Sequence, residues 1–578
     1  MNRHNVAPHR PHWADGFFAA RDRTRAWIDR AIERHSAMPY QGGHDEGTFI
    51  SSWFGFHQLF GARRVLDFAR FLRDGFAKWS HENLLHGFYP RGEAHHQTEI
   101  FTFFLCRLWR VAPDDQTAGL IVDAAHHIGN WVDGFPEWYD WDEHRFLSWR
   151  IGTESIGGPQ SRGYEVPDHF RLIQIALTAY DITGEQRYLD LSTAYADRWA
   201  TAILEAPVDE PPTVLRSGEG GPSEDEVMSA VGAHHHGDSP LERVEPHVPA
   251  GTVDVLLDLF ALTGEDRYAE AARRLCEALL PALSDAYSNP PGALLSRYRA
   301  ETGDTSLDDD AIQRMQDGIE ETLVGLDGIL RLLERTRVSG YALAAGRLYA
   351  SLADNPFAAH RLEPSADLYE RLVGERPTIG RRAETPAMAI ETLSRKPVGG
   401  IGKRQDMVRW AWENELGGLR QTSALPPPTT MLAWQILGEQ KYADSAMRTV
   451  ADRIGLAASA LRDGRTHGCA GSTVGAVASG HGRDGGYGNM TGAYFPLAAG
   501  MLRRLCQERP RVRFRRADGE EHLPDEVASL VRTLPAAGAE VLLFNDADES
   551  VMTEVALRNT PWRSVELPPG EVTAVELP

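Results

Sequence analysis

The feature of this sequence that most restricts its fold is a pair of apolar helical segments joined by a short glycine turn. The pattern occurs at residues 172–199, 253–279 and 431–454, each time around a turn of the form Gly-Glu-x-Arg/Lys-Tyr. An apolar segment precedes each turn and a more amphipathic one follows it, so each copy is predicted to be a helical hairpin, ended at its first helix by the glycine. The turn glycines are Gly184, Gly264 and Gly438, and the tyrosines expected to pack back on the first helix are Tyr188, Tyr268 and Tyr442.

Fainter copies extend this series along most of the chain. They pair residues 48–61 with 65–80, 96–111 with 117–132 and 320–335 with 339–354, and a last apolar helix at 491–504 would close against an opening one at 14–35. The spacing is irregular, unlike the period of about 34 residues in a tetratricopeptide solenoid. Long insertions between hairpins favour a closed α/α toroid, of the (α/α)6 or (α/α)7 type, over residues 1–510.

The pattern changes after residue 510. Short alternating or β-branched segments, broken by Gly, Pro and Asp, occur at 512–514, 539–544, 552–559 and 572–575. We therefore expect a small antiparallel β domain at 511–578 that packs against the toroid. The predicted fold class is mainly α with this C-terminal β domain.

Charge and hydropathy exclude several classes of protein. The 60 Lys and Arg residues against 82 Asp and Glu give a formal net charge of −22, which disfavours nucleic acid and anionic membrane surfaces. No stretch of about 18 apolar residues occurs, and residues 1–16 lack the apolar run of a secretory signal. We expect a cytoplasmic protein, and a homodimer is left open.

Cysteine and histidine spacing gives no metal or cofactor motif. The four cysteines contain no CxxC pair, and Cys106, Cys276 and Cys506 are interpreted as small core residues. The histidine run at 234–236 lies in a Gly- and Ser-rich segment that is more simply a flexible flap. No HExxH, Walker A, G-x-S-x-G or GxGxxG pattern accompanies it. We expect neither a metal nor a cofactor.

Polar motifs precede most of the predicted inner helices. They occupy residues 41–47, 86–99, 162–169, 245–249, 419–428 and 480–489. A histidine or an acidic residue before a helix is ordinarily a cap or a dipole partner. If alternate helices form the inner wall, however, these loops all open at one end of the toroid, and their convergence favours a functional pocket.

Aromatic residues in one loop favour a sugar ligand over core packing alone. Residues 131–150 interleave Trp138, Tyr139, Trp141 and Trp149 with carboxylates and Arg150. Flat rings can stack on pyranose faces while charged groups bond to hydroxyls, and tryptophan beside several charges is seldom wholly buried.

The hairpins with their Gly-Glu-x-Arg/Lys-Tyr turns resemble the six-hairpin glycosidase superfamily of α/α toroids over residues 15–505. A narrower similarity to bacterial β-L-arabinofuranosidase-like enzymes rests on Gly-Gly-Ile-Gly at 399–402 and Leu-Pro at 425–426. That family carries Glu and Cys on the following inner helix and a Cys-Cys pair before the last one. Here the corresponding residues 428–434 and 485–489 contain neither. The resemblance thus implies the architecture and the position of the pocket, without the cysteine nucleophile or zinc site.

Such toroids also include lyases and epimerases, so the reaction must come from the residues. Hydrolysis of a glycoside needs two carboxyl groups, whereas elimination from a uronate needs a His or Tyr base, a Tyr acid and a group that neutralises the carboxylate. The candidate catalytic residues are Asp45, Glu99, Asp168, His95 and Tyr487. The candidate substrate-binding residues are His44, Glu46, Tyr89, Arg91, His96, Trp141, Arg150, Glu154, Arg162, His169, His247, Arg404 and Asn489.

These sets predict a carbohydrate-active enzyme. We favour hydrolysis of an oligosaccharide or polysaccharide with paired carboxylates, because the superfamily and the expected cytoplasmic location favour it. Arginines near the loops, on an otherwise acidic protein, indicate a uronate-containing substrate. Elimination by a lyase stays open as the alternative. A non-enzymatic helical-repeat scaffold is the third reading, although its repeats would have constant length.

Overall fold

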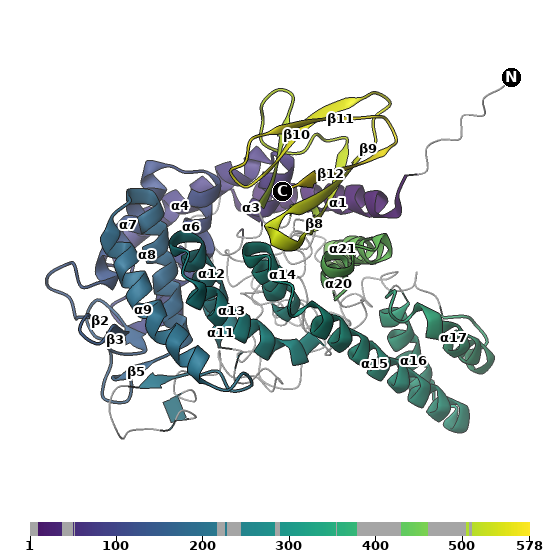
Figure 1. The fold of residues 1–578 in the computed structure, drawn as a ribbon, viewed down its shortest axis with the longest axis horizontal. Coiled ribbons are helices and arrows are strands. Elements are labelled where there is room, and N and C mark those ends of the chain that lie inside the picture. The colour runs from purple at the N-terminus through teal and green to yellow at the C-terminus, as the bar shows by residue number, and fades with distance from the viewer. Residues whose placement is uncertain are drawn as a thin grey trace.

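The computed structural model describes residues 10–36, 50, 53–216, 223, 226–227, 244, 246–283, 290–353, 355–377, 429–460, 505–507 and 511–578. Helices dominate the first part of the chain and a β domain forms its C-terminal part (Figure 1). The predicted fold class is confirmed.

Two sets of helices build the helical part. The inner helices are α3 (Trp53–Phe60), α5 (Ala94–Ile100) continuing through the π-helical η1 (Phe101–Leu105) into α6 (Cys106–Val111), α8 (Phe170–Thr183), α12 (Thr252–Thr263), α14 (Pro290–Thr302) and α20 (Thr429–Leu437). The outer helices are α1 (His12–His35), α4 (Arg63–Asn83), α7 (Asp115–Ile128), α9 (Gln186–Glu205), α13 (Asp266–Leu279) and α21 (Gln440–Ala460). Each inner helix contacts the next one along the chain, and each described hairpin pairs an inner with an outer helix.

Burial distinguishes the two sets. The first turns of α8 and α12 are buried around their whole circumference, as expected for helices enclosed on all sides. In α9 and α13 the buried residues lie on one face of each helix, beginning at Tyr188 and Tyr268, respectively. The predicted hairpin turns are confirmed, because Gly184, Gly264 and Gly438 end their helices with φ of 70°, 73° and 69°.

The first described helix closes the ring against the last described hairpin. Helix α1 packs along α21, and Arg23 Nη1 donates a hydrogen bond of 3.1 Å to the carbonyl oxygen of Ala451. A Cβ atom at Gly16 would lie 2.7 Å from Met447 Cγ, so the two helices are too close for any larger residue there. Figure 1 shows α1 beside α21. The predicted closing helix at 491–504 lies outside the described residues.

One predicted hairpin forms but does not belong to the ring. Helices α15 (Asp308–Thr336), α16 (Ser339–Leu352) and α17 (Ala359–Val373) project from the ring (Figure 1) and share their own apolar core, which includes Leu330 and Ala345. The hairpin predicted at 320–335 and 339–354 therefore belongs to an inserted bundle. Its place in the inner wall is taken by α14, whose apolar residues follow no clear helical stripe.

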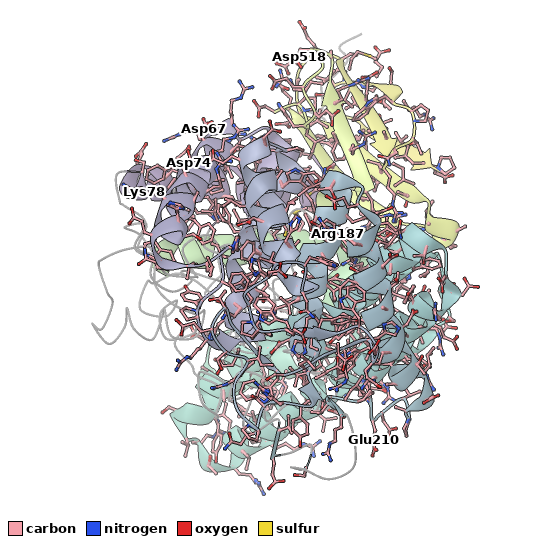
Figure 2. The ribbon with its side chains drawn as sticks, turned by 90° about the vertical axis from the view of Figure 1, so that its left-hand side faces the viewer. Asp67, Asp74, Lys78, Arg187, Glu210 and Asp518 are labelled. Atoms are coloured by element: carbon pink, nitrogen blue, oxygen red, sulfur yellow. The ribbon has the colours of Figure 1, made fainter. Side chains whose placement is uncertain are left out.

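Short strands and helical turns fill the connections that precede the inner helices. They are β1 (Gly92–Glu93), β2 (Tyr139–Asp140), β3 (Arg145–Phe146), β4 (Arg150–Ile151), β5 (Tyr164–Glu165), β6 (Leu215–Arg216), the 3-10 turn η2 (Pro167–His169) and α11 (His247–Ala250). Strand β1 pairs with β4, β2 with β3, and β5 with β6, all antiparallel. In Figure 2, Glu210 after α9 lies at one end of the molecule and Asp518 of the β domain at the other.

The β domain contains β7 (Val512–Arg516), β8 (Val527–Thr533), β9 (Ala539–Asn545), β10 (Val551–Leu557), β11 (Arg563–Leu567) and β12 (Val572–Leu577). They form two antiparallel sheets, in the orders β11-β10-β7 and β12-β9-β8. Sequence reasoning missed β8 and β11. Strand β8 is buried at nearly every position and so lacks the alternation by which the other strands were recognised.

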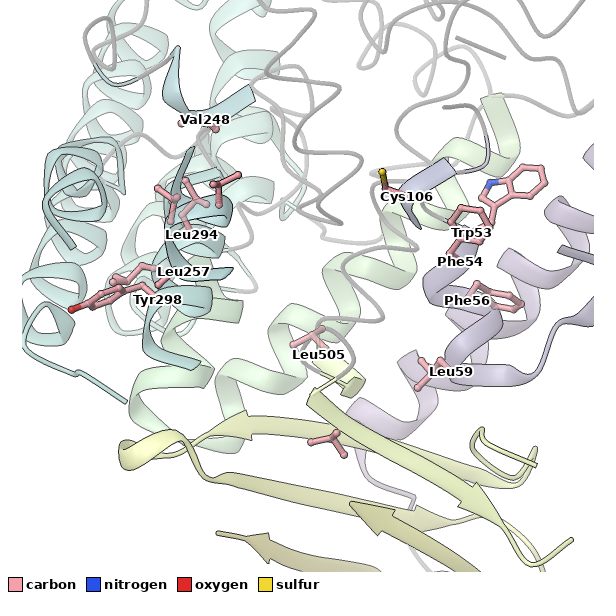
Figure 3. Packing of buried hydrophobic residues seen from close by; sticks show 14 of the residues in the cluster. Trp53, Phe54, Phe56, Leu59, Cys106, Val248, Leu257, Leu294, Tyr298 and Leu505 are labelled. Atoms are coloured by element: carbon pink, nitrogen blue, oxygen red, sulfur yellow. The ribbon is translucent and has the colours of Figure 1, made fainter. Parts of the chain in front are cut away.

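The β domain is held on the helical ring by hydrogen bonds as well as by apolar contacts. Gln435 Nε2 donates to the carbonyl oxygen of Val531 at 2.8 Å, and the Thr533 amide donates to Gln435 Oε1 at 2.7 Å. Leu59 and Leu505 lie where the helices meet the strands (Figure 3). In the part of the chain that the structure describes, no helix is long and apolar enough to cross a membrane.

Candidate functional site

Three of the loops that were predicted to gather at one end of the ring are neighbours. The turn η2, which leads into α8, contacts both α5 and α11. Helix α11 leads into α12, so the three elements stand at the beginnings of successive inner helices. This is the end of the ring opposite the β domain, because the chain leaves α9 for Glu210 there (Figure 2).

Two carboxylates and one guanidinium are buried at this junction. Glu99 on α5 is 0% exposed, Asp168 in η2 is 2% exposed, and Arg171 on α8 is 0% exposed. Charged side chains are almost never buried so completely unless opposite charges or hydrogen bonds compensate them. The Arg171 guanidinium carbon also lies 4.8 Å from the centre of the Phe103 ring, in the π-helical segment η1. Sequence reasoning missed Arg171, although its spacing of three residues from Asp168 on a helix was a usable signal.

The two predicted histidines nearest this cluster hold loops in place. His169 Nε2 donates to the Ser148 carbonyl oxygen at 2.9 Å, while Nδ1 accepts from the Val166 amide at 3.3 Å. The ring stacks on Phe146 with centroids 4.5 Å apart. Burial lowers the pKa of His169 to about 4, so the ring is neutral near pH 7.

His247 is bonded in a similar way. Its Nε2 donates to the Pro212 carbonyl oxygen at 2.7 Å, and its Nδ1 lies 3.2 Å from Thr252 Oγ1. The side chain is buried, so it joins the loop after α9 to the start of α12. The ring nitrogens of both histidines are therefore used within the protein.

A partly exposed ionic cluster lies beside the buried one. Glu93 Oε2 is 2.9 Å from His96 Nδ1, and Glu93 Oε1 accepts from Arg150 Nη2 at 3.2 Å across the β1–β4 pair. A looser pair of 3.6 Å joins Arg91 to Glu154. The Arg91 and Arg150 side chains are exposed, and exposed ion pairs add little to stability, so both guanidinium groups can reach a ligand. Glu93, which connects two of the predicted residues, was not foreseen.

Two further predicted residues, Tyr89 and Arg162, are less buried than the cluster. Tyr89 is half-buried with its ring 6.4 Å from that of Trp79, and the Arg162 side chain is exposed. Of His95 the structure describes the backbone alone, in the first turn of α5. The remaining predicted residues, His44, Asp45, Glu46, Arg404, Tyr487 and Asn489, lie outside the described residues, as does the histidine run at 234–236.

Core packing explains most of the aromatic loop at 131–150, which corrects the expectation of a row of sugar-stacking rings. Trp138, Tyr139 and Trp149 are buried, and the Asn130 side chain bonds to the backbone of the first two. Trp141 is 37% exposed and donates from Nε1 to the Gly129 carbonyl oxygen at 3.0 Å. The charged side chains between these rings reach solvent where the loop turns. A tryptophan next to charged residues in the sequence is therefore not necessarily exposed.

Within the described ranges, no group of three or more His, Cys, Asp or Glu side chains is arranged to hold a metal ion. No protein-family model and no curated protein sequence matches the chain.

Comparison with solved structures gives distant similarities. The chain is similar to an unsaturated glucuronyl hydrolase from Bacillus sp. GL1, responsible for the degradation of glycosaminoglycan, at 14% identity and a TM-score of 0.37, over 53% of this chain and 83% of that chain. It is also similar to an unsaturated glucuronyl hydrolase specific for heparin, at 10% identity and a TM-score of 0.35, over 84% of this chain and 96% of that one. At this identity and overlap the likeness carries no function over to this chain.

Proposed function

We propose that this protein hydrolyses a glycosidic bond in an oligosaccharide or polysaccharide that contains uronate sugars, with Glu99 and Asp168 as its paired carboxylates. The observation that carries the proposal is the burial of both carboxylates, with Arg171, on contacting elements at the start of neighbouring inner helices. Glycoside hydrolysis requires two such groups, one to protonate the leaving oxygen and one to activate water or attack the sugar.

The two environments suggest which group takes which role. Asp168 precedes α8, where the positive end of the helix dipole favours the ionised carboxylate. Glu99 lies within a helix that continues through η1, so it lacks this stabilisation of the charged form. Glu99 is thus the proposed proton donor, and Asp168 the proposed base or nucleophile.

Hydrolysis is preferred to elimination because two of the candidate histidine bases, His169 and His247, are occupied; His95, His96 and Tyr487 remain candidates for the alternative reaction. Elimination needs a free base to remove the proton next to the uronate carboxylate. His169 and His247 are buried and use both ring nitrogens within the protein. The proposed uronate specificity is supported by Arg91 and Arg150, since exposed guanidinium groups pair well with carboxylates.

The test is incubation with uronate-containing oligosaccharides followed by mass spectrometry of the products. A gain of water per cleavage is expected, whereas an unsaturated product that forms without water would establish elimination instead. Glu99→Gln and Asp168→Asn should each lower kcat by about 10² to 10⁴. Glu165→Gln is the matched control, because Glu165 is an equally buried carboxylate, three residues before Asp168, whose ion pair is with Arg198 of the outer helix α9. If Glu165→Gln lowers kcat as much as the other two variants, burial alone explains the losses and the assignment is wrong.

A further inference from the structure

A cavity lies between the inner helices and the β domain. Its volume is about 830 Å³, and α3, α6, α8, α12, α14 and the β domain contribute its lining. This volume is within the range of about 300 to 1,000 Å³ that is usual for small-molecule sites. On two of the helices the lining residues recur at intervals of four: Gln174 and Thr178 on α8, and Asp254 and Asp258 on α12. The cavity is therefore walled by the inward faces of the ring.

The deep wall of the cavity offers hydrogen-bond acceptors that are fixed in place. Arg297 on α14 forms ion pairs with both Asp254 and Asp258, at 2.7 Å between Nη2 and Asp258 Oδ1. Arg297 and Asp254 are nearly buried. Each carboxylate has about four acceptor positions, so it can accept from more than one donor at a time. Sugar hydroxyls are donors of this kind.

The opposite wall of the cavity carries three arginines. Arg107 and Arg110 on α6 and Arg63 on α4 line this side, and Arg63 and Arg110 are exposed. Arg110 Nη2 donates to Thr178 Oγ1 at 3.4 Å. Asp181 on α8 also faces Arg110, which opposes the rise that burial causes in the pKa of this aspartate. On a protein with a formal net charge of −22, arginines grouped at the mouth of a cavity attract anions locally.

The β domain forms the remaining side of the opening. Glu520 and Glu521 are exposed there, with Glu520 Oε2 3.2 Å from His522 Nε2 and Glu521 Oε2 3.9 Å from Arg513 Nη1. The His522 ring fills the space beside Gly61, where a Cβ atom would lie 2.4 Å from its Cδ2. This close contact holds the two parts of the wall together. The cavity thus opens beside the β domain, whereas Glu99 and Asp168 lie at the other end of the ring.

We propose that this cavity binds a small hydroxylated carboxylate of the sugar-acid class, with its carboxylate at Arg110 and its hydroxyls toward Asp254 and Asp258. The choice of a uronate rests on the proposed function. Guanidinium and carboxylate groups match in planar, bidentate geometry, and a site built for this pairing discriminates strongly against a neutral analogue. The lining reaches Thr102 and Gln174, one helical turn beyond Glu99 and Arg171, so the cavity lies along the same inner helices as the proposed catalytic carboxylates.

The experiment is calorimetric titration of the full chain with glucuronate and, separately, with glucose, which has the same ring without the carboxylate. Glucuronate should bind at least tenfold more tightly than glucose. Arg110→Gln should weaken glucuronate binding by about 10-fold or more, since one charge-assisted pair is lost. Arg110 is exposed, so this variant is expected to fold, which circular dichroism would verify. Arg187→Gln, on the outer face of the ring (Figure 2), is the control and should leave the affinity unchanged.

The outcomes separate this proposal from the catalytic one. Glu99→Gln should abolish hydrolysis and keep glucuronate binding, if both proposals hold. Binding that depends on Arg110, in a protein that hydrolyses nothing, would overturn the proposed function alone. Absence of glucuronate binding at millimolar concentration would overturn the cavity proposal. Binding that Glu99→Gln abolishes and Arg110→Gln leaves intact would overturn it as well, because the ligand would then lie at the catalytic carboxylates.

Discussion

Replacing Glu165 by glutamine should change how stability depends on pH. The Glu165 side chain is buried, and its two oxygens accept hydrogen bonds from the Phe146 amide at 3.0 Å and from Arg198 Nε at 2.9 Å. Burial raises the pKa of this carboxyl from 4.5 to about 7, even though Arg198 acts in the opposite direction. The folded protein therefore holds the Glu165 proton more tightly than the unfolded chain does.

The size and sign of the effect follow from these two values. They differ by about 2.5 pH units, and each unit corresponds to about 1.36 kcal/mol, so Glu165 contributes about 3 kcal/mol. Because the folded-state pKa is the higher one, this contribution is fully present below pH 4.5. It declines as the pH rises and is lost above about pH 7.

The measurement is urea unfolding of the original protein and of Glu165→Gln at several pH values between 4.5 and 8. The free energy of unfolding of the original protein, minus that of the variant, should fall by about 3 kcal/mol across this window. His127 and His169, whose pKa values burial lowers to about 4, change stability in the opposite direction but are common to both proteins. A difference that stays constant with pH would refute the claim that burial governs the protonation of Glu165.

The remaining predictions concern stability as well. Gly438→Ala and Gly184→Ala both place a side chain at positive φ and should each cost about 1 kcal/mol, but Gly438→Ala should cost more because its Cβ would strike the guanidinium of Arg532. Equal losses in urea unfolding would contradict the packing of the β domain against this turn. Tyr139→Phe should leave the free energy of unfolding unchanged or raise it by about 1 kcal/mol, since the Tyr139 hydroxyl is buried and has no hydrogen-bond partner among the described residues. A loss above 1 kcal/mol would reveal a partner for it.

Local chemistry made the hairpins predictable. A glycine at the end of an apolar segment and a tyrosine four residues later are short-range signals, and all three strong copies fold as expected. The position of α14 was not predictable in this way, because an inner helix is enclosed on all sides and needs no stripe. The opposite holds for the bundle α15–α17. Its apolar residues recur with a clear helical period, so the sequence predicted a hairpin of the ring where the structure has a peripheral insertion.

The position of the candidate site was predictable from the sequence, but the roles of its residues were less so. That Glu99 and Asp168 would lie at one end of the ring follows from their places before successive inner helices. The roles of His169 and His247 depend on the carbonyl oxygens of Ser148 and Pro212, which no local pattern identifies as their acceptors. The cavity beside the β domain was missed because its polar residues lie within helices, and the sequence reading considered polar residues in loops.

Because α1 packs on α21, the fold can be completed only late in the synthesis of the chain. Arg23 and its acceptor Ala451 are 428 residues apart, and Arg10 and Asp546, which form an ion pair, are 536 apart. At about 5 to 20 residues per second, the ribosome would make α21 about 20 to 90 seconds after α1. Phe17 and Trp27 of α1 can pack early against Phe60 and Trp53 of α3, but Trp13 contacts Phe544 of the β domain and must wait longer than this interval for its partner. The nascent chain thus carries an apolar face of α1 that is exposed to chaperones or to other chains until its second half arrives.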